Sequence, residues 1–297
     1  MTLRTKGIIY MFITVLMWGV SFVATKVLVL YVPPFTAGIL RFILASAILY
    51  TIIRAKEQYK DRDKLYMILA SFFGVTMYFV FENTGLKLTT ATNGSLIVSS
   101  TPVWYLLVRD LLDRRRSATI RYIGTVMAFI GVSIIVLNGR FVLKLNPLGD
   151  ILMFGAAIAW ILYTIFFEYL KNYDQLKVAR DINFWGMLFF IPFVMYELAK
   201  SPVDIHKWTA IPALLALLYL GIFCSALGYL LWNKAIVYAG GRTVTNGLYL
   251  IPIVTVIAEI IILGTKPNIY TIIGGALTII GTYIAELDNN LKQTSTP

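Results

Sequence analysis

Charged side chains inside long apolar runs are the residues of this sequence most able to do chemistry. Glu82 and Glu259 each interrupt such a run, and Lys26 and Arg41 interrupt two others. A charge in hydrocarbon costs free energy and is usually retained for a purpose. One arrangement pairs the two glutamates with Lys26 and Arg41, so that the helices are held shut on one side of a membrane. In the other, Glu82 or Glu259 binds a substrate or carries a proton.

A further group of charges lies toward the opposite ends of the runs. Glu168, Arg109 and Asp110 are expected to gather there and to pair. Lys26 has an alternative, because its long apolar stem could carry the ammonium group to the interface. The candidate gate or coupling residues are therefore Lys26, Arg41, Glu82, Glu168 and Glu259.

Aromatic side chains near the predicted midplane form the second candidate set. At about 1.5 Å of rise per residue, Trp18 and Trp160 lie roughly 17 and 18 Å into their runs, in an apolar layer about 30 Å thick. Facing lipid, each indole N–H would be unpaired, so an inward orientation is favoured. Such a pocket would stack planar rings or bind organic cations, although simple helix packing is the alternative. The predicted substrate-binding residues are Trp18, Tyr78, Glu82, Trp104, Trp160 and Tyr163.

Few residues could support an enzyme or a metal site. Cys224 is the only cysteine and His206 the only histidine, so a metal cluster, a disulfide or a Ser-His triad has little to build on. No G-x-x-x-x-G-K-[ST] loop occurs, which excludes ATP hydrolysis of that kind. We expect no metal, no cofactor and no use of ATP. Solute movement would then follow a gradient of the solute or of a coupled ion such as a proton.

The composition indicates the elements that position these residues. The 297 residues are 59% apolar and 14% charged, with a mean hydropathy of +0.77, too few charges to cover a soluble domain. Apolar runs of about 20 residues, long enough to cross a bilayer, recur along the chain. Helices are expected because water is excluded there. The ten predicted spans are 7–30, 35–54, 65–86, 90–112, 118–138, 148–170, 181–199, 209–233, 244–264 and 268–286.

The basic residues set the predicted orientation. The net charge of +11 could indicate nucleic acid or anionic lipid, but the charges follow the loops instead. Of the 26 lysines and arginines, 17 fall on the side of both termini, three (Lys26, Arg41 and Arg109) within spans, and six opposite: Lys87, Arg140, Lys144, Lys200, Lys207 and Lys266. The positive-inside rule then places both termini in the cytoplasm. We expect a multi-pass protein of the cytoplasmic membrane, with the lipid bilayer and no nucleic acid as partner.

The second half of the chain echoes the first. A proline is followed by glycines at +22 and +29 in two sets: Pro102, Gly124, Gly131 and Pro252, Gly274, Gly281. Five spans per unit would bring the halves in from opposite sides, the inverted repeat of many secondary transporters. The glycines are expected to allow close helix packing. We predict an all-α membrane protein of two inverted five-helix repeats, 1–146 and 147–297, the second with a short cytoplasmic tail.

Several segments resemble EamA-type members of the drug/metabolite transporter superfamily. They are Trp18-Gly19-Val20-Ser21-Phe22-Val23-Ala24-Thr25-Lys26, Pro33-Pro34, Leu40-Arg41-Phe42, Leu148-Gly149-Asp150, Ala159-Trp160, Tyr163-Thr164, and Gly228-Tyr229-Leu230-Leu231-Trp232-Asn233-Lys234-Ala235. The resemblance covers roughly residues 7–286. It departs at residues 113–116 and 264–266, where the family often has a Gly-Glu-Lys-like turn, so a role for that glutamate is not carried over. The family implies ten helices in two repeats and metabolite transport without enzymatic activity, and its substrates range widely.

The favoured function is therefore secondary transport by alternating access. Its substrates would be small organic molecules, namely amino acids, especially aromatic or hydrophobic ones, or related compounds. The first alternative is a transporter of choline-like or other amines that uses the aromatic pocket with Glu82 and Glu259. An intramembrane enzyme is more distant, because one His and one Cys in separate segments supply no nucleophile with its base. A receptor or assembly subunit fits the repeat less well than rocking about a central site.

Overall fold

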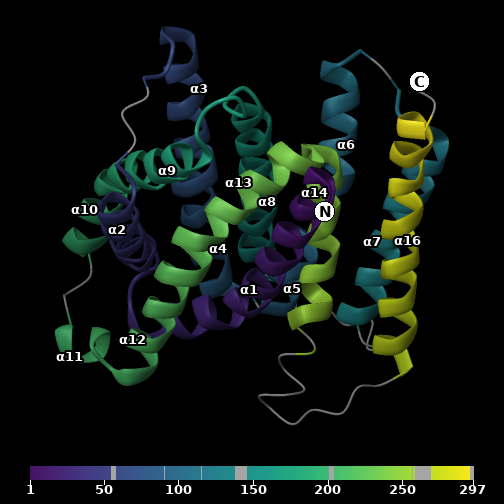
Figure 1. Cartoon of the computed structure of the whole chain (residues 1–297). Coiled ribbons are helices and arrows are strands. Elements are labelled where there is room, and N and C mark those ends of the chain that lie inside the picture. Colours follow the sequence, from purple (N-terminus) through teal and green to yellow (C-terminus); the bar gives the residue numbers. More distant parts are fainter. Residues whose placement is uncertain are drawn as a thin grey trace.

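The chain folds as a bundle of helices (Figure 1). The computed structural model describes residues 1–54, 58–89, 91–114, 116–137, 146–200, 204–255, 257 and 269–294, and these ranges hold no strand. Within these ranges six helices are long and apolar enough to cross a membrane, namely Leu3–Tyr31 (α1), Pro34–Ile52 (α2), Asp61–Leu88 (α3, η1 and α4), Pro147–Glu168 (α8), Gln175–Lys200 (α9 and α10) and Ile211–Ala239 (α12, η2 and α13). The expectation of an all-helical membrane protein is confirmed.

Two of these long helices contain a π-helical segment. The first runs as α3 (Asp61–Ser71), η1 (Phe72–Met77) and α4 (Tyr78–Leu88), and the second as α12 (Ile211–Leu218), η2 (Tyr219–Leu227) and α13 (Gly228–Ala239). The wider turns of a π-helix are rare in proteins, and where they occur they are often close to a functional site. In both helices the first two residues after the π-turn are buried, Tyr78 and Phe79 in the first and Gly228 and Tyr229 in the second. The α9 helix (Gln175–Phe189) continues as α10 (Ile191–Lys200), and a short α11 (Ile205–Trp208) precedes α12.

Two other predicted spans are interrupted next to a proline. The α5 helix (Ala91–Val98) ends at two turn residues, and α6 (Thr101–Leu112) begins beside Pro102. The α14 helix (Gly241–Asn246) passes into the 3-10 turn η3 (Gly247–Leu250), and α-helix resumes over 251–255 around Pro252. Proline has no N–H to donate and its ring crowds the preceding turn, which favours a break at this point.

Helices α7 (Thr119–Leu137) and α16 (Ile269–Thr294) lie side by side (Figure 1). A methyl group on Gly124 would lie 2.3 Å from the backbone nitrogen of Ala285, and one on Gly281 would lie 2.4 Å from that of Ala128. Neither position can take a side chain unless the helices separate. The prediction that these glycines allow close helix packing is confirmed.

Several of the largest buried side chains meet where α1, α4, α8 and α13 pack together. Trp232 and Tyr163 are fully buried and Tyr229 is 1% exposed. Small residues along α8, among them Ala156 and Ala157, are also fully buried and let the neighbouring helices approach. This aromatic centre surrounds the candidate site.

Candidate functional site

A small buried cavity lies at the centre of the bundle and is lined from both halves of the chain. Aromatic rings form much of its wall and two charged side chains reach it, the principal residues being Trp18, Arg41, Tyr78, Glu82, Trp160 and Tyr229. About 30 Å³ is open to the centres of water molecules, which is room for about two waters at roughly 10–15 Å³ each. An organic solute would therefore need the surrounding helices to move apart.

The aromatic wall is built from edge-to-face contacts. The Trp18 and Trp160 rings lie 5.1 Å apart at an angle of 87°, and Tyr78 lies 5.1 Å from Trp160. Such edge-to-face geometry places the positive ring edge against a negative ring face. The indole N–H of Trp18 donates to the carbonyl oxygen of Cys224 at 3.0 Å, whereas the Trp160 N–H has no hydrogen-bond partner in the described part of the chain. The structure thus brings together three of the aromatic residues singled out in the sequence.

The other two predicted aromatic residues lie elsewhere. Tyr163 stands behind the wall, 4.7 Å from the Trp160 ring, and its hydroxyl donates to Asn233. Trp104 is 43% exposed on α6, packs against Phe154 at 5.6 Å, and does not line the cavity. Depth along a helix was the basis for choosing Trp104, and depth does not specify which face of the helix points inward.

Glu82 and Arg41 line the cavity without pairing. Glu82 is 2% exposed, accepts a long hydrogen bond of 3.4 Å from the Tyr78 hydroxyl on Oε1, and has no partner for Oε2 among the described residues. Arg41 is 3% exposed, donates from Nε to Ser225 Oγ at 2.8 Å, and holds its guanidinium carbon 4.2 Å from the Phe79 ring centre. Of the two arrangements considered from the sequence, the one that pairs Glu82 with Arg41 or Lys26 is not formed among the described residues. Glu259 lies outside the described residues.

Lys26 binds backbone oxygens instead of a glutamate. Its Nζ donates to the carbonyls of Leu86 at 2.5 Å and Thr89 at 2.9 Å, at the end of α4. A cation at the carboxyl end of a helix meets unpaired carbonyls and the negative end of the helix dipole. Lys26 therefore joins α1 to the end of α4 through backbone carbonyls and does not pair with Glu82. We call this end of the bundle, which the sequence predicts to face outward, the outer end.

A second contact at the outer end was not foreseen from the sequence. Glu197 of α10 accepts hydrogen bonds from the backbone N–H groups of Phe35 and Thr36 at 3.0 and 2.7 Å. These groups belong to the first turn of α2, where backbone donors are unpaired and an anion is favourable. The proline pair before α2 marked that helix start, but nothing in the sequence indicated which carboxylate would reach it.

An ion-pair cluster joins α6, α8 and α14 at the opposite, inner end. Arg109 contacts Glu168 at 3.0 Å, and Arg242 contacts Asp110 at 2.8 Å and Asp113 at 3.0 Å. The gathering of Glu168, Arg109 and Asp110 expected from the sequence is found. Glu168 also accepts a hydrogen bond of 2.7 Å from the hydroxyl of Tyr105.

Comparison with known proteins identifies the family to which the chain belongs. The sequence profile of the EamA-like transporter family matches residues 5–137 and again residues 147–287. The chain belongs to the EamA-like transporter family. It is 31% identical to an uncharacterized transporter of Archaeoglobus fulgidus, over 95% of this chain and 98% of that protein. It is 24% identical to a probable amino-acid metabolite efflux pump of Salmonella typhimurium, over 95% of each chain.

The fold is shared more widely than the sequence. A protein of known crystal structure superposes with a TM-score of 0.78 at 18% identity, over 99% of this chain and 100% of that one. The resemblance to EamA-type transporters seen in the sequence is confirmed. The chain is a multi-pass membrane protein and a transporter of small molecules, as its family and relatives are, and those are not enzymes.

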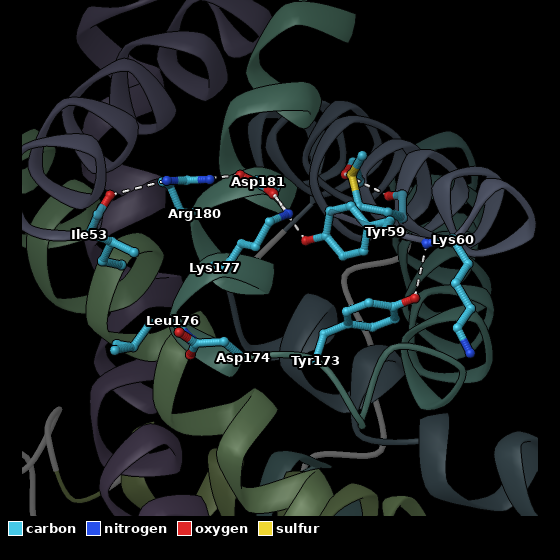
Figure 2. Close-up of polar contacts among 11 residues, drawn as sticks. Ile53, Tyr59, Lys60, Tyr173, Asp174, Leu176, Lys177, Arg180 and Asp181 are labelled. Atoms are coloured by element: carbon cyan, nitrogen blue, oxygen red, sulfur yellow. Dashed lines mark hydrogen bonds and ion pairs between the residues drawn. The ribbon is translucent and has the colours of Figure 1, made fainter. Parts of the chain in front are cut away.

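This EamA-like transporter carries one more charged cluster, of which Lys177 and Arg180 entered the sequence analysis only as loop charges. Figure 2 shows Lys177, Arg180 and Asp181 of α9 near Ile53 and Tyr59, which lie between α2 and α3 in the sequence. Lys177 Nζ lies 2.5 Å from Asp181 and 3.3 Å from the centre of the Tyr59 ring, while Arg180 donates to the carbonyl of Ile53 at 3.1 Å. Lys177 and Asp181 are almost fully buried. The four-residue spacing of Lys177 and Asp181 was the available signal, because such residues are neighbours on one helix face.

Proposed function

We propose that this protein moves small organic metabolites across the cytoplasmic membrane by alternating access. Amino acids with aromatic or hydrophobic side chains are the favoured substrates. The observation that carries the proposal is the central cavity, which is buried, walled by aromatic rings, and lined by both halves of the chain. A cavity with only about 30 Å³ open to water centres cannot admit a solute without a change of conformation.

Contacts at the two ends of the bundle supply the gates that this mechanism needs. The outer end is held by Lys26 on the end of α4 and by Glu197 on the start of α2. The inner end is held by the Arg109–Glu168 and Arg242–Asp110 pairs. Opening one set while the other stays closed would expose the cavity to one side at a time.

The arrangement in the membrane is part of the proposal: ten spans, two inverted five-helix repeats over 1–146 and 147–297, and both termini in the cytoplasm. Three features support the repeat. The family profile matches each half once, a π-helical segment occurs in one long helix of each half, and a helix break falls beside Pro102 and beside Pro252. Interrupted helices near the substrate site are common in transporters built from inverted repeats.

The alternative of an organic-cation transporter is less well supported. A Salmonella relative is named for amino-acid metabolite efflux, and Arg41 reaches the same cavity as Glu82. A buried arginine disfavours an unaccompanied cation, because like charges repel strongly at low dielectric. A proton remains the coupled ion that we consider, with Glu82 as its carrier, because this carboxylate lines the cavity and one of its oxygens has no described partner.

Counterflow in proteoliposomes tests the proposed function. Vesicles holding purified protein and a high concentration of one unlabelled solute are given a trace of the same solute in labelled form. We expect transient accumulation with phenylalanine, tryptophan and leucine, and none in protein-free vesicles. Accumulation of choline but of none of these amino acids would favour the alternative. Absence of counterflow with the whole panel, nucleosides included, would count against transport of these classes altogether.

A further inference from the structure

We propose that the central cavity recognises its substrate as a zwitterion, with Glu82 facing the ammonium group and Arg41 facing the carboxylate. The proposal rests on the proposed transport function and deepens it. It defines the substrate class by two charged groups carried on one small molecule, and leaves the side chain to the aromatic wall.

Glu82 offers a place for a cation. Glu82 is only 2% exposed, and its Oε2 has no hydrogen-bond partner among the described residues. Oε1 has only the long contact of 3.4 Å from the Tyr78 hydroxyl. A buried carboxylate oxygen without a donor is costly. A primary ammonium group carries three N–H donors and would supply the missing ones.

Arg41 offers a place for a carboxylate. The guanidinium group has five N–H donors, and its hydrogen bond in the described structure is the one from Nε to Ser225. The other N–H groups are therefore available in a side chain that lines the cavity. The planar fork of N–H groups matches the two oxygens of a carboxylate. Phe79 lies against the guanidinium group at 4.2 Å and supports it from one side.

Arg41 and Glu82 are each hydrogen-bonded to a neutral side chain and not to each other. Arg41 is tethered to Ser225 on η2, and Glu82 is tethered to Tyr78 at the start of α4. A simple amine would satisfy Glu82 and leave Arg41 buried and unpaired, while a simple carboxylate would do the reverse. Leaving one member of a buried charged set unpaired is strongly unfavourable. A zwitterion satisfies both and adds no net charge to the cavity.

The nearby rings then complete the site. The Trp160 ring centre lies 5.1 Å from that of Trp18 and 5.1 Å from that of Tyr78, and all three rings border the same cavity. An aromatic or aliphatic side chain joined to the zwitterion would pack against these faces. The charged pair sets the class of compound, and the rings set the side-chain preference.

The test compares four compounds with one ring and different charges: L-phenylalanine, phenethylamine, 3-phenylpropionate and phenylalanine amide. Each competes with labelled L-phenylalanine in counterflow, and each is assayed by the thermal shift of purified protein. We expect L-phenylalanine to bind at least tenfold more tightly than the other three. In Arg41→Gln the preference for L-phenylalanine over phenethylamine should disappear, and in Glu82→Gln the preference over 3-phenylpropionate should disappear. Asp61→Asn and Arg62→Gln change exposed charges and serve as matched controls that keep the preference.

If a variant fails to fold, the selectivity of the unmodified protein among the four compounds still tests the proposal. Arg41→Lys is a further variant, which keeps the positive charge but loses the planar set of guanidinium N–H donors. Equal competition by phenethylamine would overturn the zwitterion site while counterflow still upheld transport. Failure of every compound and every amino acid in counterflow would overturn both proposals. Unchanged selectivity in folded Arg41→Gln and Glu82→Gln would also overturn the assignment of these two residues.

Discussion

The carboxylate of Glu168 occupies the space in which a side chain at position 241 would begin. A methyl group on Gly241 would lie 2.3 Å from Glu168 Oε1 and 2.6 Å from the Tyr105 hydroxyl. The inner cluster of ion pairs therefore depends on a glycine at the start of α14 as well as on its charged members.

Gly241→Ala should loosen the inner cluster. The added methyl group has to displace Glu168 from Arg109 and Tyr105, at a cost of about 1–3 kcal/mol of unfolding free energy. Glu168→Gln should lower the free energy of unfolding less in the Gly241→Ala protein than in the unmodified protein, because both changes disrupt the same contacts. Thermal or denaturant unfolding in detergent, applied to the two single variants and the double variant, measures this difference. Strictly additive losses would show that Gly241 and Glu168 act independently.

Gly281→Ala should separate α7 from α16, since its methyl group would lie 2.4 Å from a backbone nitrogen. Gly275 lies on the same helix with nothing within 4 Å of the corresponding position, and Gly275→Ala is the matched control. We expect Gly281→Ala to lower the free energy of unfolding by about 2 kcal/mol or more. The control should be neutral or gain up to about 1 kcal/mol from better helix propensity. Similar unfolding curves for the two variants would contradict the packing account.

Lys26→Met should weaken the contact between α1 and α4 at the outer end. Two hydrogen bonds from an ammonium group to α4 carbonyls are lost, a change of about 1.5–3 kcal/mol for a charged donor. The exposed Lys87→Met should cost little. Because Lys26 does not pair with Glu82, the exchange Lys26→Glu with Glu82→Lys should recover neither stability nor counterflow. Recovery in the exchanged variant would restore the ion-pair interpretation.

Labelling with an impermeant maleimide should establish the orientation. Cys224 is the chain's one cysteine and is buried, so Cys224→Ala gives a clean background. A cysteine at His206 should react from outside intact cells, and one at Arg116 should react only after the cells are opened; both positions are exposed. The expectation follows from the excess of Lys and Arg on the side of the termini. Labelling of position 116 from outside would reverse the orientation.

The helices were predictable because hydropathy depends on the sequence alone. Six predicted spans correspond to the long apolar helices of the structure, and the breaks next to Pro102 and Pro252 have their cause in proline itself. Which side of a helix faces inward was not predictable from depth. Trp160 and Trp104 were both placed near the midplane, yet one lines the cavity and the other is 43% exposed.

The charged partners were harder to predict than the layers in which they lie. Glu82 and Arg41 do share a layer and a cavity, but each is held by a neutral partner. Lys26 meets backbone carbonyls, which are present at every helix end and leave no mark in the sequence. A prediction that matches only opposite charges therefore cannot identify main-chain carbonyls as the partners of a lysine.

The π-helical segments have a consequence for comparing relatives of this protein. Adding or removing one residue in an α-helix turns everything beyond it by about 100° around the helix axis. Tyr78 and Glu82 follow η1, and Tyr229 follows η2. A π-turn holds one more residue than an α-helical turn, so a one-residue deletion within Phe72–Met77 would restore regular α-helix and leave Tyr78 and Glu82 facing the cavity. A one-residue gap in a relative therefore preserves the cavity residues when it falls in a π-turn and changes them when it falls in the regular helix just before them.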